Sequence, residues 1–387
     1  MLSCQRDKFY LPAEVHYLNG AYMSPQMRSV ERAGLEAVKR KNLPYHFDVS
    51  DFFEPVNRLK ALFAQLILTP DSDRVAIIPS VSYGMACVAR NVSLVRGATI
   101  VTVEDQFPSN VYPWNRLAES NGAGIITVSS PKPGEVSWSE KVMDAIDQRT
   151  ALVAVPHVHW ADGTIFDLEA IRRVAHARGA LLVVDGTQSV GALPFDQERI
   201  KADALICAGY KWLMGPYSIG LAYFGPAFDH GIALEENWIN REGSEDFSRL
   251  VDYQHAYRPG AARYSVGEHS NFILVPMMIA ALEELLAWEV KSIQKYCRSL
   301  LAEIEPSLRE LQVAIPDNSS AHLFGLRLAG SFNYDYLKQL LKEEEVYVSF
   351  RGNSIRVSTH LYNKKRDLRA LSKCIARTFD KSRPKSV

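Results

Sequence analysis

Short runs of apolar residues alternate with helix-period segments between residues 75 and 224. Seven of these runs are rich in β-branched residues and have the length of a strand. They are Val75–Ile78, Ala98–Val103, Gly124–Val128, Ala151–Val155, Leu181–Asp185, Ala204–Cys207 and Ile219–Phe224. Helix-period segments separate most of them, for example 84–94, 138–146 and 168–178. Alternation of this kind predicts an α/β fold.

Several of the predicted strands are apolar at consecutive positions, as in the Leu-Leu-Val-Val run of 181–184. Such a strand is covered on both faces, which is typical of a mainly parallel sheet wrapped by helices. We therefore predict a mainly parallel, seven-stranded sheet. Ligands of such sheets gather at the carboxyl ends of the strands, so we look for candidate chemistry there.

The pattern changes after about residue 270 to longer helical segments with a few short strands. A helical pattern over 276–310 precedes a strand near 323–328, a helix over 334–344, strands near 346–350 and 354–358, and a helix over 365–379. This order predicts a smaller α+β domain. We assign residues 1–30 to an N-terminal segment packing with the small domain, 31–270 to the large α/β domain and 271–387 to the small domain.

Composition and charge exclude several classes of protein. The 387 residues include 44 basic and 44 acidic side chains, so no excess of charge favours nucleic acid or a membrane surface as a partner. The most apolar stretch, 272–288, contains Pro276 and two glutamates and is shorter than the ~20 apolar residues of a membrane span. The five cysteines form no CxxC pair, and the first residues are too charged for a signal peptide. We expect a cytoplasmic protein without disulfides.

Candidate chemistry lies at two neighbouring strand ends. Asp185 ends the strand 181–185, and Lys211 follows 26 residues later, just past the next predicted strand. A carboxylate facing a lysine at such an edge suits pyridoxal phosphate, whose aldehyde needs a lysine and whose ring nitrogen needs an anionic partner. Glycines and aromatic residues flank Lys211, which favours a desolvated ammonium with a lowered pKa. A structural aspartate or a solvated lysine is the ordinary alternative for either residue alone.

A phosphate site is predicted after the first strand of the sheet. Residues 80–84, Ser-Val-Ser-Tyr-Gly, follow the strand 75–78 and open a helix. The free backbone N–H groups of a helix N-terminus bind phosphate well. A serine that only caps the helix explains this segment equally well.

The segments around the aspartate and the lysine resemble a known family. Residues 185–188, Asp-Gly-Thr-Gln, and 210–216, Tyr-Lys-Trp-Leu-Met-Gly-Pro, are similar to those of the class V aminotransferases, which are fold-type I pyridoxal phosphate enzymes. The similarity is strongest to the isopenicillin N epimerase-like branch, which includes carbon–sulfur lyases, and weaker to kynureninases and cysteine desulfurases. It extends from Tyr17 to the region of Arg356. The resemblance implies a fold-type I transferase that uses pyridoxal 5'-phosphate.

Roles of individual residues follow from this resemblance. It implies Lys211 as the Schiff-base lysine and catalytic residue, Asp185 as the partner of the ring nitrogen, and Gln188 as a hydrogen-bond donor near the phenolic oxygen. Freed from the cofactor, Lys211 would remove the α-proton of an amino-acid substrate.

Further cofactor contacts are implied by position. Val81 and Ser82 would hold the phosphate, Tyr210 would reach it, and Phe107 would stack on the ring, where a core phenylalanine is the alternative. Trp238 and Ser270 match segments that cross to the cofactor of the other subunit in this family. The resemblance therefore implies a homodimer with cofactor sites near the subunit interface.

On the substrate side, Arg356 matches the arginine that grips the α-carboxylate, and its planar guanidinium suits that bidentate contact. A strand arginine in a surface ion pair is the alternative. Asn19 and Tyr22 match the N-terminal segment that lines the same pocket. The resemblance thus implies an α-amino acid as substrate.

Two departures from relatives limit the reaction. Desulfurases that form an enzyme persulfide need a cysteine shortly before the arginine, and residues 346–355 contain none. Where desulfurases place an asparagine beside the ring oxygen, this chain has Trp160. We expect transamination or carbon–sulfur elimination, with epimerisation as an alternative that needs a second base.

A metalloenzyme is the alternative from a different class. His157 and His159 are two positions apart, and on a strand they would point to one face and could bind a metal. We find no third ligand at a convincing spacing, so the sequence predicts no metal site.

Overall fold

The computed structural model describes residues 2–132, 134–328, 333–352 and 354–382. Its helices are α1 (Arg28–Arg40), α2 (Ser50–Leu66), α3 (Val81–Asn91), α4 (Tyr112–Asn121), α5 (Trp138–Asp144), α6 (Leu168–Ala177), α7 (Gln197–Ile200), α8 (Leu274–Trp288), α9 (Val290–Leu301), α10 (Glu305–Glu310), α11 (Tyr334–Glu343) and α12 (Lys365–Ser382). Its strands are β1 (His16–Tyr17), β2 (Val75–Ile78), β3 (Thr99–Val103), β4 (Gly124–Val128), β5 (Thr150–Pro156), β6 (Leu181–Asp185), β7 (Ala204–Ala208), β8 (Gly220–Phe224), β9 (Leu323–Arg327), β10 (Val346–Tyr347), β11 (Ser349–Arg351) and β12 (Ser354–Ser358).

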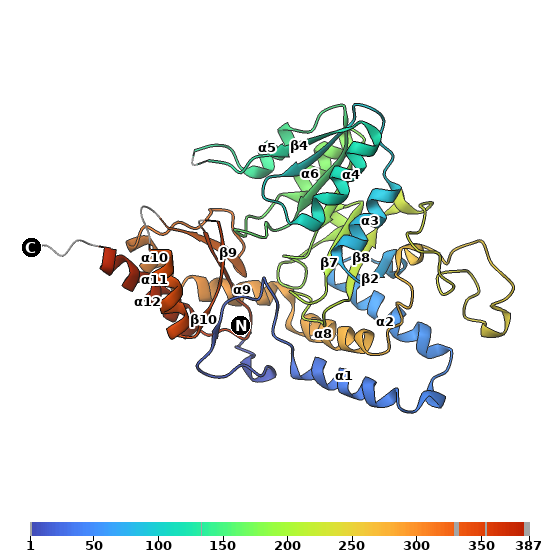
Figure 1. Cartoon of the computed structure of the whole chain (residues 1–387), viewed down its shortest axis with the longest axis horizontal. Coiled ribbons are helices and arrows are strands. Elements are labelled where there is room, and N and C mark those ends of the chain that lie inside the picture. Colours follow the sequence, from blue (N-terminus) through green and yellow to red (C-terminus); the bar gives the residue numbers. More distant parts are fainter. Residues whose placement is uncertain (1, 133, 329–332, 353, 383–387) are drawn as a thin grey trace, which may run out of the picture.

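The large domain is built on the predicted seven-stranded sheet, in the order β2-β8-β7-β6-β5-β3-β4. The pairs among β3 to β7 are parallel, and β8 runs antiparallel to both of its neighbours. This arrangement confirms the predicted α/β class and the mainly parallel sheet. Figure 1 shows this domain on the right, with helices on either side of the sheet.

Alternation along the strands divides the core between two layers. Leu182 and Val184 of β6 pack in the core that includes residues of α2, α5, α6 and α8. Val183, between them, packs in the core that includes residues of α3 and α4. Because both faces of β6 are covered, the strand is apolar at every position before Asp185, as its sequence indicated.

The small domain holds a three-stranded sheet in the order β11-β12-β9, with antiparallel pairs. Its core includes residues of α9, α10, α11 and α12, and Figure 1 shows it to the left of the large domain. The prediction of one helical pattern over 276–310 was wrong in detail. Glu289 has a φ of 59°, a conformation that interrupts the helix between α8 and α9, and a second break follows Leu301, before α10 begins at Glu305.

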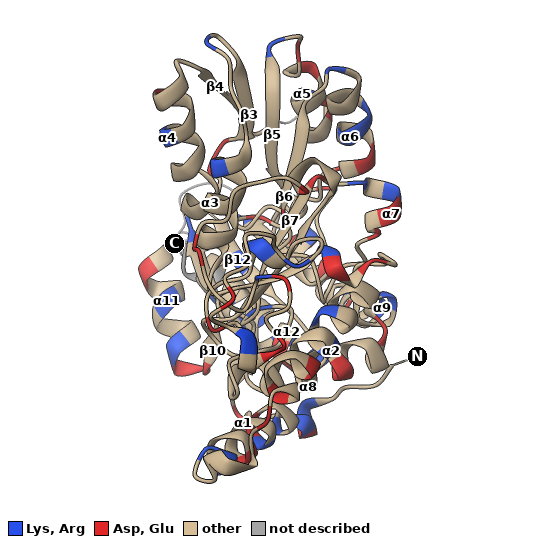
Figure 2. Ribbon diagram, turned by 90° about the vertical axis from the view of Figure 1, so that its right-hand side faces the viewer, with Lys and Arg blue, Asp and Glu red and all other residues tan. Residues whose placement is uncertain are grey.

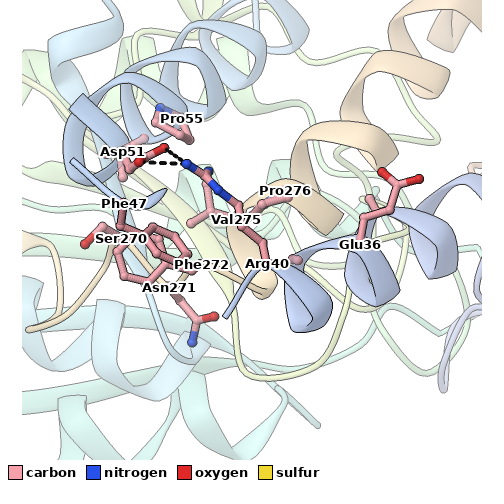
Figure 3. Close-up of a pocket in the computed structure, with 13 residues that line it drawn as sticks. Glu36, Arg40, Phe47, Asp51, Pro55, Ser270, Asn271, Phe272, Val275 and Pro276 are labelled. Atoms are coloured by element: carbon pink, nitrogen blue, oxygen red, sulfur yellow. Dashed lines mark hydrogen bonds and ion pairs between the residues drawn. The ribbon is translucent and has the colours of Figure 1, made fainter. Parts of the chain in front are cut away.

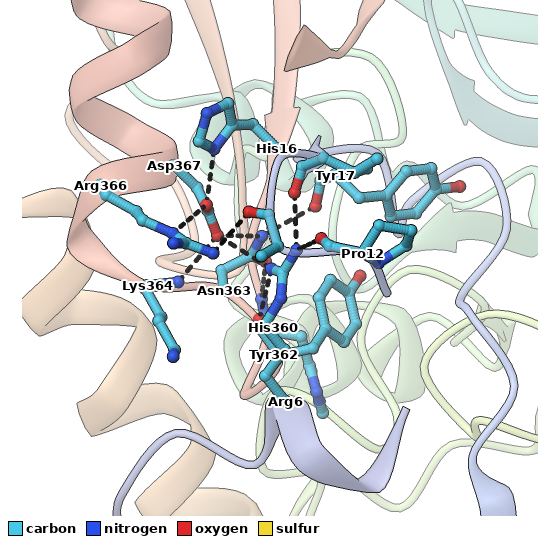
Figure 4. A network of polar contacts seen from close by, with 12 residues as sticks. Arg6, Pro12, His16, Tyr17, His360, Tyr362, Asn363, Lys364, Arg366 and Asp367 are labelled. Carbon is cyan, nitrogen blue, oxygen red and sulfur yellow. Dashed lines mark hydrogen bonds and ion pairs between the residues drawn. The ribbon is translucent and has the colours of Figure 1, made fainter. Parts of the chain in front are cut away.

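The N-terminal segment lies against the small domain. β1 pairs in parallel with β10, His16 opposite Val346. The buried carboxylate of Asp367 on α12 accepts hydrogen bonds from His16 Nδ1 at 2.7 Å and from the Lys364 amide at 2.8 Å, and Arg6 Nη1 is 3.5 Å away (Figure 4). The domain limits drawn from the sequence stay a prediction.

The surface helices carry both signs of charge. Figure 2 shows Lys and Arg next to Asp and Glu on α6, α7 and α11. No helix among the described residues is long and apolar enough to cross a membrane. The cytoplasmic location expected from the sequence stays a prediction.

Candidate active site

Asp185 and Lys211 lie at the same edge of the central sheet. Asp185 is the last residue of β6, and Lys211 follows the last residue of β7 by three positions. β6 and β7 are parallel neighbours, with Asp185 opposite Ile206. Each of the two charged residues is only 6% exposed. The structure thus brings the predicted pair to one buried strand-end site.

Burial changes the protonation of both groups. It lowers the pKa of Lys211 to about 8, although the charge of Asp185 acts in the opposite direction. Burial also raises the pKa of Asp185, which the hydrogen bond from the Thr187 amide at 2.9 Å and the charge of Lys211 oppose. A lysine with such a pKa has a substantial neutral fraction near pH 8, as attack on an aldehyde requires.

The lysine points toward a cavity of about 220 Å³. Lys211 Nζ lies 5.3 Å from the centre of the Phe107 ring and 5.6 Å from that of Tyr210. The predicted site residues that line this cavity are Val81, Ser82, Phe107, Gln188, Tyr210 and Lys211. The cavity therefore combines an aromatic wall, an amine and polar groups.

One end of the cavity is the N-terminus of α3. Ser80 caps this helix by accepting a hydrogen bond from the Tyr83 amide at 3.2 Å, and its hydroxyl lies 2.9 Å from that of Ser82. Ser80 therefore caps the helix, and Ser80, Val81 and Ser82 also line the cavity. A phosphate at this place would meet the free N–H groups and the positive end of the helix dipole. Together with the lysine and the buried aspartate, this end fits pyridoxal phosphate.

Gln188 is held from two sides. Its Nε2 donates to the Ala21 carbonyl at 3.1 Å, and its Oε1 accepts from the indole of Trp212 at 2.8 Å. An amide NH₂ group has two donors, so one N–H remains for a ligand in the cavity. Trp212 is a residue whose contact with the site the sequence analysis missed, although it directly follows Lys211.

The loop that carries the lysine packs closely against the loop after β6. Gly191 has a φ of +100°, and a Cβ there would lie 2.2 Å from the Trp212 carbonyl oxygen. A side chain would collide with the backbone next to Lys211. The Ser24 amide donates to the Tyr210 carbonyl at 3.2 Å, which fixes the N-terminal segment over the same loop.

Arg356 is 2% exposed and lies on β12. Its Nη1 donates to the Trp160 carbonyl at 3.0 Å, and its Nη2 donates to the Ser349 hydroxyl at 3.3 Å. That hydroxyl donates to Asn19 Oδ1 at 2.6 Å, so the structure brings Asn19 and Arg356 together through Ser349. Sequence reasoning missed Ser349, and its position opposite Arg356 in a hairpin is the signal that could have found it. Burial lowers the pKa of Arg356 to about 9.

Tyr22 and Trp160 were also singled out from the sequence. Tyr22 is exposed, and its amide closes a turn on the Asn19 carbonyl at 3.0 Å. The Trp160 indole donates to the Asp105 carbonyl at 2.5 Å, so its N–H is used within the protein. The ring of Trp160 stands edge-on to Phe107 at 5.6 Å and lines the cavity.

Trp238 and Ser270 do not line the cavity of Lys211. They line a separate cavity together with Phe52 and Phe272. Ser270 also lines a third one, between α1, α2 and α8, which Figure 3 shows with the Arg40–Asp51 ion pair at its wall. Within one chain these residues are therefore not part of the candidate site.

The structure does not favour the metalloenzyme alternative. β5 ends at Pro156, so His157 and His159 lie beyond the strand. His157 packs edge-on against Phe195, whereas His159 packs against Trp138, so the expectation of one shared strand face was wrong. Among the described residues, no group of three or more His, Cys, Asp and Glu side chains could hold a metal ion.

Comparisons with known proteins place the chain in a family. The family model of the class V aminotransferases matches residues 44–372. The uncharacterized aminotransferase YcbU of Bacillus subtilis (strain 168) is 27% identical over 82% of this chain and 83% of its own length. A probable cysteine desulfurase of Halalkalibacterium halodurans is 26% identical over 81% of this chain and 77% of its own length.

Solved structures share the fold. A cysteine desulfurase from Thermococcus onnurineus NA1 aligns with a TM-score of 0.83 at 21% identity and covers 98% of this chain and 99% of its own. A cystine C–S lyase in complex with its product cysteine persulfide aligns with a TM-score of 0.83 at 17% identity, over 95% of this chain and 98% of its own. The chain has fold type I and belongs to the class V aminotransferase family, as a pyridoxal phosphate-dependent enzyme of the transferase or lyase type.

Proposed function

We propose that this enzyme acts on an α-amino acid, holds its cofactor covalently through Lys211 and uses the same amine to move the α-proton. The observation that carries the proposal is the buried pair of Lys211 and Asp185 at adjacent strand ends, where the pKa of the lysine is lowered to about 8. An amine with this pKa is both a nucleophile and a proton acceptor near neutral pH.

The other residues of the cavity divide the binding of the cofactor. Pyridoxal phosphate supplies an electron sink for the charge left on a substrate carbon. In the proposal, Val81 and Ser82 bind the phosphate at the α3 N-terminus, and Tyr210 lies near it. Phe107 covers the ring, Asp185 keeps the ring nitrogen protonated and Gln188 donates to the phenolic oxygen.

Arg356 orients the substrate by binding its α-carboxylate. A guanidinium offers two parallel N–H donors, and Ser349 and the Trp160 carbonyl fix its plane. Asn19 supports it through Ser349, and the Tyr22 amide donates to the Asn19 carbonyl on the same N-terminal segment. This arrangement leaves the α-carbon to face Lys211.

We propose transamination or carbon–sulfur elimination as the reaction. Curated relatives bear the names aminotransferase and cysteine desulfurase, which fits both. We do not propose a persulfide on the enzyme, because residues 346–355 contain no cysteine and Cys297 and Cys374 are buried. Epimerisation ranks lower because it needs a second base, and Lys211 is the one amine among the described residues that line the cavity.

We also propose a homodimer. Apolar side chains are exposed on α1 and after it, and on the 235–258 loop: Leu35, Val38, Leu43, Tyr45, Trp238, Val251 and Tyr253. The cavities lined by Trp238 and Ser270 lie beside these surfaces, so a second subunit would cover them. Light scattering should give twice the mass of one chain, and a monomer at micromolar concentration would contradict the proposal.

Borohydride reduction tests the role of Lys211. The purified protein should be yellow, and reduction should fix pyridoxyl mass on the peptide that contains Lys211. Lys211→Ala should lose this mass, whereas Lys201→Ala, at an exposed lysine, should keep it. Attachment at another lysine would overturn the proposal.

A panel of amino acids then identifies the reaction. Keto acid without ammonia indicates transamination, ammonia with pyruvate or a sulfur product indicates elimination, and loss of optical activity alone indicates epimerisation. The last result would contradict our ranking.

A further inference from the structure

The hairpin that carries Arg356 places a second arginine on the same face. β11 and β12 are antiparallel, with Ser349 opposite Arg356 and Arg351 opposite Ser354. Side chains two positions apart on a strand share a face, so Arg351 lies on the face of Ser349. Arg351 and Arg356 are therefore diagonal neighbours across the hairpin.

Both guanidinium groups approach the ring of Trp160. Cζ of Arg351 lies 5.2 Å from the centre of this ring, and Cζ of Arg356 lies 5.9 Å from it. Trp160 lines the cavity of Lys211 and also a second cavity, which Arg351 and Ser354 line. The second cavity therefore adjoins the candidate active site at Trp160.

No carboxylate forms an ion pair with either arginine in the part of the chain that the structure describes. Burial is the main cause of the lowered pKa of Arg356 and of Lys211; the charge of Arg351 lowers both further, and that of Arg356 also lowers the pKa of Lys211. Asp162, in the second cavity, is already paired with Arg327 at 2.9 Å. Asp105 also lines this cavity, but it is exposed and forms no ion pair with Arg351. The positive charges of Arg351 and Arg356 are thus not neutralised by a carboxylate among the described residues.

Arg351 also has an unused donor. Its Nη1 donates to the Phe350 carbonyl at 2.8 Å, whereas its Nε is buried and has no hydrogen-bond partner. A buried donor of a charged group without a partner is unfavourable, and a bound ligand would satisfy it. Arg356 Nε is buried without a partner in the same way.

We propose that Arg351 binds a second anionic group of the substrate, so that the enzyme acts on α-amino acids whose side chain ends in a carboxylate or a similar anion. The inference rests on the proposed function, in which Arg356 binds the α-carboxylate. The substrate side chain extends past Trp160 into the second cavity, where Arg351 forms charge-assisted hydrogen bonds with its end.

Calorimetric titration of the holoenzyme with three probes tests this site without turnover. Succinate has two carboxylates, succinamate replaces one by an uncharged amide of the same shape, and propionate has one. Wild type should bind succinate at least about tenfold more tightly than succinamate, as expected for a hydrogen bond between charged groups. Arg351→Gln should lose this preference and keep its affinity for propionate.

Arg327→Gln is the matched control, because Arg327 lines the same second cavity but is neutralised by Asp162. It should keep the preference for succinate. Equal binding of succinate and succinamate by wild type would overturn the inference. A parallel loss of propionate affinity in Arg351→Gln would also overturn it, because both arginines would then hold one carboxylate.

The titration separates this inference from the proposed function. If the preference for succinate depends on Arg351 and yet no amino acid is converted, the anion site stands and the proposed reaction fails. If amino acids are converted without any preference for an anionic side chain, the reaction stands and the anion site fails.

Discussion

The two sides of the candidate site differ in how their charges are balanced. We call Asp185, Gln188 and Lys211 the cofactor side, and Trp160, Arg351 and Arg356 the substrate side. The cofactor side holds one carboxylate and one lysine whose charges attract each other, whereas the substrate side has two guanidinium groups and no carboxylate. The cofactor side thus contains both signs of charge, and the substrate side contains only positive charge, which the proposed anionic substrate would balance.

The largest effect should come from the cofactor side. In the proposed function, Asp185→Asn removes the anionic partner of the ring nitrogen and leaves the phosphate contacts at the α3 N-terminus in place. We expect turnover to fall by about a hundredfold or more, the loss typical of a buried electrostatic contact, with much of the cofactor retained. Single-turnover kinetics and the absorbance of the bound cofactor check this. Near wild-type turnover would show that Asp185 does not pair with the ring.

Substitutions on the substrate side should weaken the binding of the substrate and leave the rate of the chemical step largely unchanged. Arg356→Ala should raise KM for an α-amino acid roughly 10- to 150-fold, equivalent to roughly 1.5–3 kcal/mol of binding free energy. Arg356→Lys should restore only part of the affinity, because an ammonium lacks two parallel donors. The decarboxylated amine is the control and should be almost unaffected. An unchanged ratio of kcat/KM for the amino acid and the amine would make Arg356 a structural residue.

A smaller effect is expected from the residue that positions Arg356. Ser349→Ala removes the hydroxyl that joins Arg356 to Asn19, at 3.3 and 2.6 Å. Loss of one ordinary hydrogen bond of about 0.5–1.5 kcal/mol should raise KM by roughly two- to tenfold and leave kcat unchanged. Ser349→Thr, which keeps a hydroxyl, is the control. A fall in kcat alone would contradict a positioning role.

The smallest expected effect concerns the pKa of Lys211, which substitutions on the two sides should shift in opposite directions. Attachment of the cofactor to the cofactor-free protein needs neutral Lys211, so its rate should rise with pH and level off above about 8. Asp185→Asn removes a charge that raises this pKa and should lower the midpoint. Arg356→Gln removes a charge that lowers it and should raise the midpoint. Stopped-flow absorbance measures both, and shifts of the same sign would contradict the comparison.

The cofactor side could be predicted from the sequence because its residues are close along the chain. The apolar strand before Asp185 and the 26-residue spacing to Lys211 placed both at one sheet edge, and the structure brings them together there. Strands of the central sheet were found because burial on both faces leaves a continuous apolar run.

The substrate side could not be predicted in full because it depends on pairing between distant segments. Asn19 reaches Arg356 only through Ser349, and Arg351 joins the site through hairpin register. The local pattern of apolar and polar residues indicates neither of these two contacts. Likewise, α1 and α2 were not identified, and the break at Glu289 depends on a positive φ that its residue type does not indicate.

β1 and β10 pair although they lie far apart in the sequence, so this pair can form only late in the synthesis of the chain. The N-terminal strand emerges first, yet its partner at Val346 is among the last parts to leave the ribosome. Between Lys211 and Arg356, translation at about 5–20 residues per second takes roughly seven to thirty seconds. During this interval Asp185 and Lys211 have been synthesised, whereas Arg351 and Arg356 have not. In the proposed function, the residues that bind the cofactor are therefore synthesised before the arginines that bind the substrate.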